Sequence, residues 1–251
     1  MMIDSRSPRI LTTRDVAIRS NAGVAGFVYV LLAVGAAWFL FLALNSAPAA
    51  KQGVYATLAL LVAAFMFGWN ALVGAVEHRV IRISSEGVLR FTPRRRLAAS
   101  YLVIACAGVI PGTLSLVGGV GDLGTLRRSP EVLALLSLIW LGLQGWSLRL
   151  PTGLTVSPEG LSGVRNGGTI DVTWDQLASA TATGGDRGSS LELGLADGGA
   201  VAVQGMYVGS DPNLVAAIIE HFRTHPDDRA LLADAPEAVR AVELASLQSG
   251  G

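Results

Sequence analysis

Charged side chains are missing from four long stretches of the chain, and these stretches predict its architecture. They cover residues 20–50, 52–76, 97–121 and 132–148. A helix of about 20 apolar residues spans the hydrocarbon core of a bilayer, which is about 30 Å thick. The last stretch is close to the lower limit of about 17 residues. The sequence therefore predicts a membrane α-helical region over 22–149, with four transmembrane helices at about 22–44, 54–76, 97–119 and 129–148.

The pattern changes after residue 150 to short runs with β character, separated by turn clusters rich in glycine. This spacing predicts an antiparallel meander between 154 and 204. A helix follows, with Asp211 as its N-cap and Pro212 at its first position. We expect an α+β domain over 150–234, in which this helix closes an antiparallel sheet, and a C-terminal tail over 235–251. Trp174 and Phe222 are predicted core residues of this domain, not site residues.

A strand-turn signature occurs twice. The segments Ser84-Ser85-Glu86-Gly87 and Ser157-Pro158-Glu159-Gly160 each lie between two β-like runs, and they are 73 residues apart. The same offset carries the first pair of apolar stretches onto the second pair, which indicates two copies of a helix pair followed by a strand pair. Chance is the alternative, because turns of this kind are common. We place the first strand pair, 79–92, on the cytoplasmic side, and whether it joins the C-terminal domain stays open.

The arginines predict the orientation. The N-terminal segment 1–21 and the loop between the second and third helices carry ten arginines, whereas the other two loops carry three basic residues. Because basic loops stay in the cytoplasm, both termini are expected there, with the chain in a bacterial plasma membrane. A cleaved signal peptide ending near Ala47-Pro48-Ala49 is the competing hypothesis, although its apolar run is longer than the usual 7 to 15 residues. From Arg149 onward there are 6 basic and 13 acidic residues, a net charge of −7.

Arg94, Arg95 and Arg96 directly precede the third apolar stretch. At this place they would reach the phosphate level of the inner leaflet, where each basic residue gains about 1 kcal/mol from anionic lipid. We therefore predict an inner-leaflet lipid contact for these three residues. The plainer interpretation is that they only fix the orientation. A further hypothesis is that the acidic C-terminal domain is held against this basic loop.

Few residues suggest chemistry. The four stretches contain no ionisable carboxylate or basic group, which disfavours an ion or proton pathway. His221 and His225 lie one helical turn apart, but a third metal ligand is not evident. Cys106 is the single cysteine, and the glycines at 119, 121 and 124 lack the strand that a dinucleotide fingerprint must follow. We predict no catalytic site, no cofactor and no metal.

The C-terminal domain resembles a known family. The segments Thr155–Leu161 and Thr173–Leu177, together with His221–Pro226, are similar to bacterial PH-like domains of actinobacterial membrane proteins. The resemblance implies an interaction or scaffolding module with no shared catalytic motif. The expected function is therefore a non-enzymatic membrane protein whose partners are the lipid bilayer and a protein or a second copy, with no nucleic acid. The alternative is a small transporter component or an accessory subunit of a membrane complex.

Overall fold

The computed structural model forms two compact units, and each is described here by itself. One unit holds residues 21–73 and 95–149, and the other holds residues 1–20, 74–94 and 150–251. The structure describes residues 3–6, 8, 10, 22–46, 49–73, 76, 78–84, 87–93, 95–117, 129–147, 152–165, 168–185 and 188–249.

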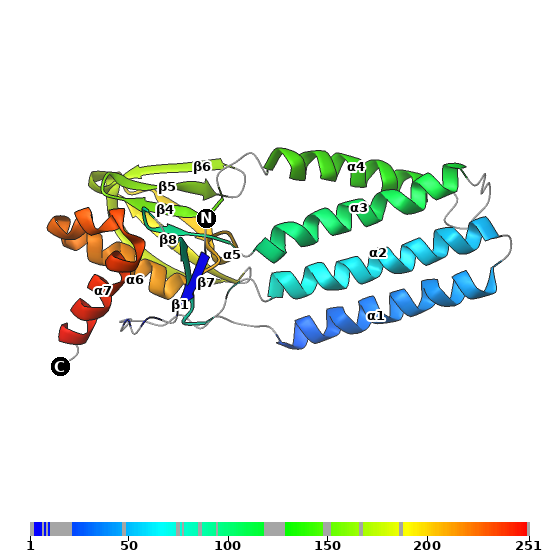
Figure 1. Ribbon diagram of the computed structural model, residues 1–251, viewed down its shortest axis with the longest axis horizontal. Coiled ribbons are helices and arrows are strands. Elements are labelled where there is room, and N and C mark those ends of the chain that lie inside the picture. Colours follow the sequence, from blue (N-terminus) through cyan, green and yellow to red (C-terminus); the bar gives the residue numbers. More distant parts are fainter. Residues whose placement is uncertain are drawn as a thin grey trace. The chain divides into compact units, whose positions relative to one another are not determined.

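The first unit is a set of four helices, which Figure 1 shows side by side in chain order. Each helix packs against the next one in the sequence. Three of them contain stretches that are long and apolar enough to cross a membrane, namely Ala25–Asn45, Ala49–Val73 and Ala99–Val117, while the apolar part of the fourth is the shorter Val132–Trp146. The helices are α1 (Ala22–Asn45), α2 (Ala49–Val73), α3 (Arg95–Val117) and α4 (Ser129–Ser147).

Small residues bring these helices close together. Gly68 of α2 faces Ile104 of α3, and Gly108 of α3 faces Ser137 of α4 so closely that a Cβ at Gly108 would overlap the serine side chain. Such close approach is the usual basis of helix packing in a bilayer. Gly108 therefore has a packing role between α3 and α4. α3 continues through Pro111 without a break in its assigned range.

Three predicted boundaries of two helices need correction. The second helix begins at Ala49 and ends at Val73, not near 54 and 76, and the third begins at Arg95, not at 97. The predicted bounds follow the ends of the charge-free stretches, but a charged residue such as Lys51 or Arg96 fits readily in the first turn of a helix. A charge therefore does not mark the first residue of a helix, and the helix can begin up to about one turn earlier than the apolar stretch.

The second unit contains a six-stranded antiparallel sheet in the order β1-β2-β3-β4-β5-β6. β2 and β3 form one hairpin, β4 and β5 form a second, and β3 pairs with β4 through Arg90 opposite Thr155 and Phe91 opposite Leu154. The strands are β1 (Ile3–Arg6), β2 (Ile81–Ser84), β3 (Arg90–Phe91), β4 (Leu154–Ser157), β5 (Gly160–Arg165) and β6 (Gly168–Thr173).

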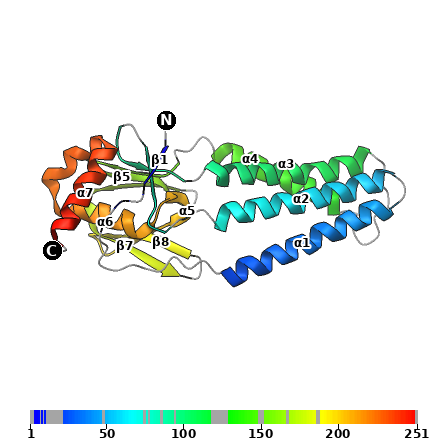
Figure 2. The same ribbon diagram turned by 60° about the horizontal axis from the view of Figure 1, so that its bottom comes forward.

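A three-stranded antiparallel sheet and the remaining helices complete this unit. The second sheet has the order β7-β8-β9, and α6 packs on β7 and β8 (Figure 2). Asp211 caps α6 and Pro212 is its first residue, as the sequence predicts. The strands are β7 (Leu177–Gly185), β8 (Gly188–Leu195) and β9 (Ala200–Gln204). The α-helices are α5 (Gly205–Val208), α6 (Pro212–Thr224) and α7 (Ala235–Ser249), and the 3-10 helices are η2 (Trp174–Gln176) and η3 (Pro226–Ala233).

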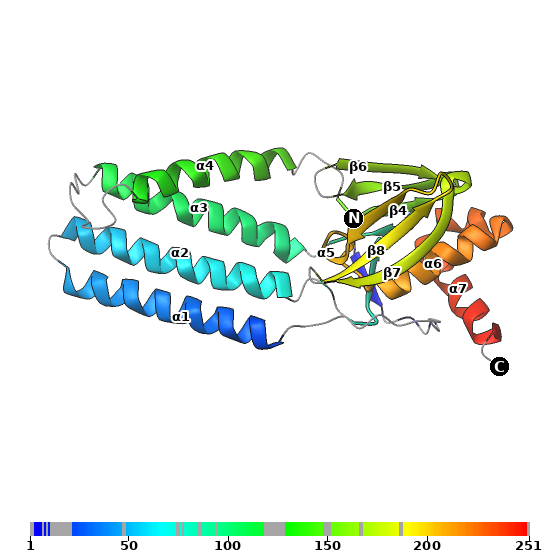
Figure 3. The same cartoon turned by 180° about the vertical axis from the view of Figure 1, so that it is seen from behind.

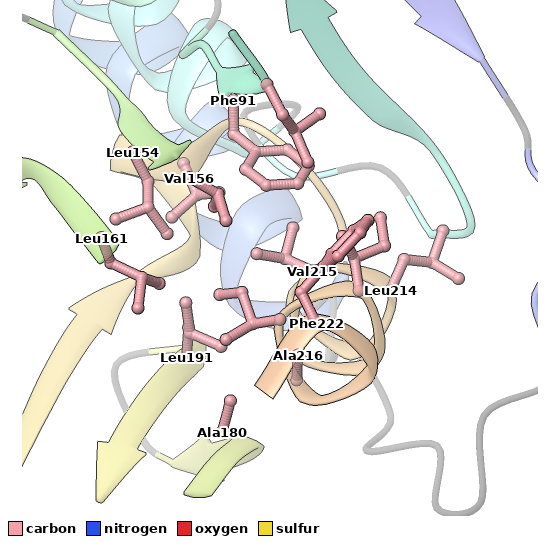
Figure 4. Close-up of a cluster of buried hydrophobic side chains, with 14 of the residues drawn as sticks. Phe91, Leu154, Val156, Leu161, Ala180, Leu191, Leu214, Val215, Ala216 and Phe222 are labelled. Atoms are coloured by element: carbon pink, nitrogen blue, oxygen red, sulfur yellow. The ribbon is translucent and has the colours of Figure 1, made fainter. Parts of the chain in front are cut away.

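One hydrophobic core joins both sheets and α6. Figure 4 shows Phe222, Leu214 and Val215 of α6 among side chains of β3, β4, β5, β7 and β8. Phe222 is 0% exposed and Trp174 is 5% exposed. Both residues therefore lie in the core of this domain.

The domain extends beyond the predicted range 150–234 at both ends. The strand pair 79–92 supplies β2 and β3, and the N-terminal segment supplies β1 and the buried Ile10. The segment 235–251 is more than a tail, because Ala235, Val239 and Val242 of α7 are buried in the same core. The sheet is thus assembled from three pieces of chain that are separated by helix pairs.

The offset between the two strand pairs persists in the structure. β2 begins at 81 and β4 at 154, a difference of 73 residues, and α1 and α3 begin at 22 and 95, which is the same difference. The two hairpins are neighbours in the sheet, joined through β3 and β4. Each half of the chain therefore contributes one helix pair and one hairpin.

Candidate functional site

A cluster of polar groups, several of them buried, surrounds the corner between α5 and α6. We call it the Asp211 junction, and it consists of Asp211 and the groups that bond to this corner. It fixes the piece of chain that follows α2. Its residues are His78, Arg79, Val80, Arg82, Gly209, Ser210, Asp211 and Asn213.

Asp211 lies at the centre of the junction and is 1% exposed. Its Oδ1 accepts hydrogen bonds from the backbone N–H of Asn213 at 2.9 Å and from Asn213 Nδ2 at 3.0 Å. Its Oδ2 accepts from the backbone N–H of Arg79 at 2.7 Å and lies 3.3 Å from His78 Nδ1. The Asp211 backbone N–H donates to Val80 O at 2.9 Å. This carboxylate is therefore committed to structural donors, which leaves it poorly suited to acid or base catalysis.

Arg79 adopts a backbone conformation that is rare for its residue type. Its φ is 55°, in the left-handed region that favours glycine. Such a conformation persists only where surrounding contacts hold it, and the bond from Arg79 N–H to Asp211 is one of these contacts. The junction thus forces a sharp turn between the end of α2 and the start of β2.

Arg82 forms the second connection to this corner. Its backbone N–H donates to Ser210 Oγ at 2.9 Å, and its Nη1 donates to Gly209 O at 2.6 Å. The residue is 8% exposed, and this burial lowers the pKa of its guanidinium. Gly209 has a φ of 67°, and a Cβ there would lie 2.6 Å from Pro93 Cα. The corner therefore approaches the chain that precedes α3 as well as the chain that follows α2.

A further contact holds the chain that follows α4. Arg90 of β3 donates from Nη2 to Thr152 O at 2.8 Å and from Nε to the same oxygen at 3.2 Å. Thr152 comes shortly before β4. Of the four chain connections between the two units, three are therefore preceded or followed by residues that contact the sheet or the corner between α5 and α6 within this domain.

His221, in the last turn of α6, stacks on His225, the residue that follows this helix. The ring centroids of His221 and His225 are 4.5 Å apart, with an interplanar angle of 18°. His221 Nε2 lies 3.2 Å from Asp228 Oδ2 of η3, and His225 Nδ1 lies 3.0 Å from His221 O. In the part of the chain that the structure describes, no group of three His, Cys, Asp or Glu side chains has the geometry of a metal site. The pair therefore joins α6 to η3.

We expect His221 to make the domain less stable in acid. Burial and the neighbouring His225 lower the pKa of His221, and Asp228 only partly opposes them. The unfolded chain therefore binds a proton near the ordinary histidine pKa of about 6.5, before the folded state does, and stability falls as the pH drops through this range. Denaturant unfolding of the wild type at pH 8 and pH 5.5, compared with His221→Gln, checks this. A pH dependence that is unchanged in the variant would contradict it.

Trp174 is anchored by polar groups as well as by packing. Its Nε1 donates to Ser157 O at 3.0 Å, and the guanidinium of Arg229 lies 4.7 Å from its ring centroid. Arg229 also donates from Nε to Phe222 O at 2.9 Å, close to the C-terminus of α6. Trp174 thus links the first hairpin of the C-terminal region to η3, which explains why a tryptophan occupies this core position.

The predicted lipid-contact arginines are only partly described. Arg94 lies outside the described residues, Arg95 is the first residue of α3, and Arg96 is exposed on its first turn. The glycines at 119, 121 and 124 also lie outside the described residues.

Polar residues of the helical unit bond mainly to their own helices. Thr57 Oγ1 donates to Gly53 O at 3.0 Å, and Thr113 Oγ1 donates to Ile110 O at 2.9 Å. A threonine hydroxyl readily reaches the carbonyl three or four residues earlier in its own helix. Among the described residues, Trp69 Nε1 and Ser115 Oγ are buried without a hydrogen-bond partner.

The sequence predicts Asp211 as a helix cap, but it does not indicate that the Asp211 side chain also accepts a hydrogen bond from the Arg79 N–H.

No family model matches the chain, and no curated protein or solved structure matches it either. The functional argument therefore rests on the residues and contacts described above.

Proposed function

We propose that the chain is a non-enzymatic, multi-pass protein of a bacterial plasma membrane that carries a cytoplasmic PH-like domain as an interaction or scaffolding module. One observation carries the proposal. β1, the β2–β3 hairpin and β4 belong to one sheet, although α1 and α2 separate the first from the second, and α3 and α4 separate the second from the third. The domain is therefore built into the membrane protein and is not a module appended to its end.

The same observation supports four membrane crossings. Strands of one sheet lie on one side of a membrane, so an even number of crossings must separate β1 from β2 and β3 from β4. If α3 crosses, α4 must cross too, even though its apolar part is short. Helices of this length can span by thinning the bilayer locally or by snorkelling of flanking residues such as Arg149. A cleaved signal peptide ending near residue 50 would remove β1, which disfavours that alternative.

The cytoplasmic placement rests on the arginine count, since the N-terminal segment and the loop between the second and third helices contain ten arginines, and these two segments supply β1, β2 and β3 to the sheet. The PH-like assignment is supported by the strand order of β4 to β9 and by the helix that covers them. Arg94, Arg95 and Arg96 would then meet anionic lipid at the inner leaflet. The domain surface would be available for protein contacts.

Cysteine labelling tests the crossings. In a Cys106→Ser background, single cysteines are introduced as Lys51→Cys, Gly121→Cys and Thr169→Cys. We expect a membrane-impermeant maleimide to label the first two in intact cells, and the third only after permeabilisation. Protection of position 121 in intact cells would contradict four crossings, whereas labelling of position 169 would contradict a cytoplasmic domain.

Photo-crosslinking in membranes tests the interaction role. A photoreactive residue at the exposed positions 175 and 227 should give discrete adducts in the full chain. The adducts should vanish in Phe222→Ala, which disrupts the domain, and should persist in Leu244→Ala, which does not. A complete absence of adducts from both positions would count against an interaction module.

A further inference from the structure

β7 presents an open strand edge. It lies at the margin of the three-stranded sheet, where β8 occupies one side, as Figure 3 shows. With nine residues it is the longest strand of the described chain. Among the described residues, no other strand pairs with its outer side. An unpaired edge of this length is a ready template for another strand.

The hydrogen-bonding groups of this edge can be assigned from one contact. The backbone N–H of Ala180 donates to Glu220 Oε2 of α6 at 3.3 Å, so it points away from β8. In an antiparallel ladder, alternate residues point the same way. The backbone groups of Ala182 and Gly184 therefore also face outward. Glu220 is itself held by Arg223 and satisfies only the first of these positions.

β7 itself lacks the charged residues and prolines that commonly protect an edge strand. From Leu177 to Gly185 it contains no charged residue and no proline. The edges of the six-stranded sheet differ, since β1 carries Asp4 and Arg6, and β6 carries an exposed Asp171. The other margin of the smaller sheet, β9, contacts β5 and α5. Charges on an edge strand are a common device against pairing, and β7 has none.

The charge of the domain points to the occupant. The unit that contains this sheet, residues 1–20, 74–94 and 150–251, has 13 basic and 17 acidic residues, a net charge of −4, so two copies carry like net charge and repel each other. A charge-free edge is where two such domains can approach at the lowest electrostatic cost. The solvent side of this edge carries the hydroxyls of Thr181 and Thr183, the second of which lies 3.0 Å from Ser190 Oγ. Threonine pairs across antiparallel strands are favourable, so the edge is complementary to itself.

We propose that a second copy of this chain pairs with the first through β7, antiparallel and two-fold symmetric, so that the two three-stranded sheets become one. The inference rests on the proposed interaction function and names its partner. A membrane that holds both copies in the same orientation raises their effective concentration, which favours such a pairing.

Single-cysteine cross-linking tests the pairing in the full chain. In the Cys106→Ser background, Thr181→Cys and Thr183→Cys are treated in membranes with a short bis-maleimide, and Thr169→Cys on the β6 edge is the matched control. We expect dimers of the chain from the two β7 positions and at least about fivefold fewer from the control, because residues near a two-fold axis lie within about 8 Å of the partner strand. Equal dimer yields from all three positions would overturn the proposal, and so would adducts of β7 with a different protein.

Charge variants supply an independent readout. Thr183→Lys and Thr183→Glu each bring like charges together across the axis, so each should dimerise about tenfold more weakly than the wild type. A mixture of the two variants should recover the dimer, since opposite charges then meet. Dimerisation that neither variant weakens overturns the proposal. If the photo-crosslinking adducts remain while the β7 dimers are absent, the proposed interaction function is retained with another partner, and the pairing through β7 is overturned. If both the adducts and the dimers are absent, the interaction function and the pairing are both overturned.

Discussion

Phe222→Ala is expected to destabilise the domain by about 3 to 5 kcal/mol. The side chain is 0% exposed and fills the space between α6 and the two sheets, as Figure 4 shows. Truncating a buried phenylalanine loses its burial energy and leaves a cavity that the surroundings fill only in part. Because a domain of this size has a total stability of about 5 to 15 kcal/mol, much of the domain population should unfold under mild denaturant. Hydrogen exchange of β4, β5, β8 and α6 in the purified full chain measures this loss.

Leu244→Ala is the matched control for this prediction. Leu244 lies on α7 of the same domain but is 54% exposed, so its truncation should change stability by less than about 0.5 kcal/mol. Exchange in α1 to α4 should stay at the wild-type level in both variants, because Phe222 belongs to the core of the other unit. Equal destabilisation by the two substitutions would mean that the core does not depend on Phe222.

Local patterns were enough to predict the helices and the C-terminal strands. Apolar stretches free of charge mark α1 to α4, because burial in lipid excludes charged side chains over the whole length of a span. Glycine-rich turns mark the ends of β5, β7 and β8, because these residues set the chain reversals. Asp211 and Pro212 mark the start of α6 through capping chemistry. Each of these signals is carried by residues close together in the sequence.

The assembly of the sheet could not be predicted in the same way. β1 is four residues long, and a strand of this length carries too little alternation to be recognised. Its pairing with β2 joins Ile3 to Ser84, and the pairing of β3 with β4 joins Phe91 to Leu154. Such contacts depend on which faces are left to be buried once the helices have formed. Nothing in either segment alone indicates its partner.

The Asp211 junction shows the same limit at the level of one side chain. The capping role of Asp211 follows from its neighbours in sequence, whereas its bond to Arg79 joins residues 132 positions apart. The left-handed conformation of Arg79 gave no sequence signal either, since glycine or asparagine is the usual marker of that region. The function of such a residue becomes visible only in the folded chain.

Asp211→Ala is expected to destabilise the domain by about 3 to 5 kcal/mol and to release the segment that follows α2. The substitution removes the acceptor of the buried Asn213 N–H and of the part-buried Arg79 N–H, and an unsatisfied buried donor costs about 1 to 3 kcal/mol. The turn at Arg79 also loses a contact that holds its unfavourable φ. Hydrogen exchange should therefore rise in residues 79–84 and in the first turn of α6. Denaturant unfolding gives the total change.

Asp211→Asn separates the two roles of this side chain. Asparagine caps a helix as well as aspartate does, so the bond to Asn213 N–H and about 1 kcal/mol of capping energy should be retained. Its amide nitrogen cannot accept the Arg79 N–H, so residues 79–84 should still exchange faster than in the wild type. Asp197→Ala is the control for loss of an aspartate, because Asp197 is exposed and bonds only locally, to Gly199 N–H at 2.8 Å. If Asp211→Asn restores wild-type exchange in residues 79–84, the junction depends on the helix cap and not on the long-range bond to Arg79.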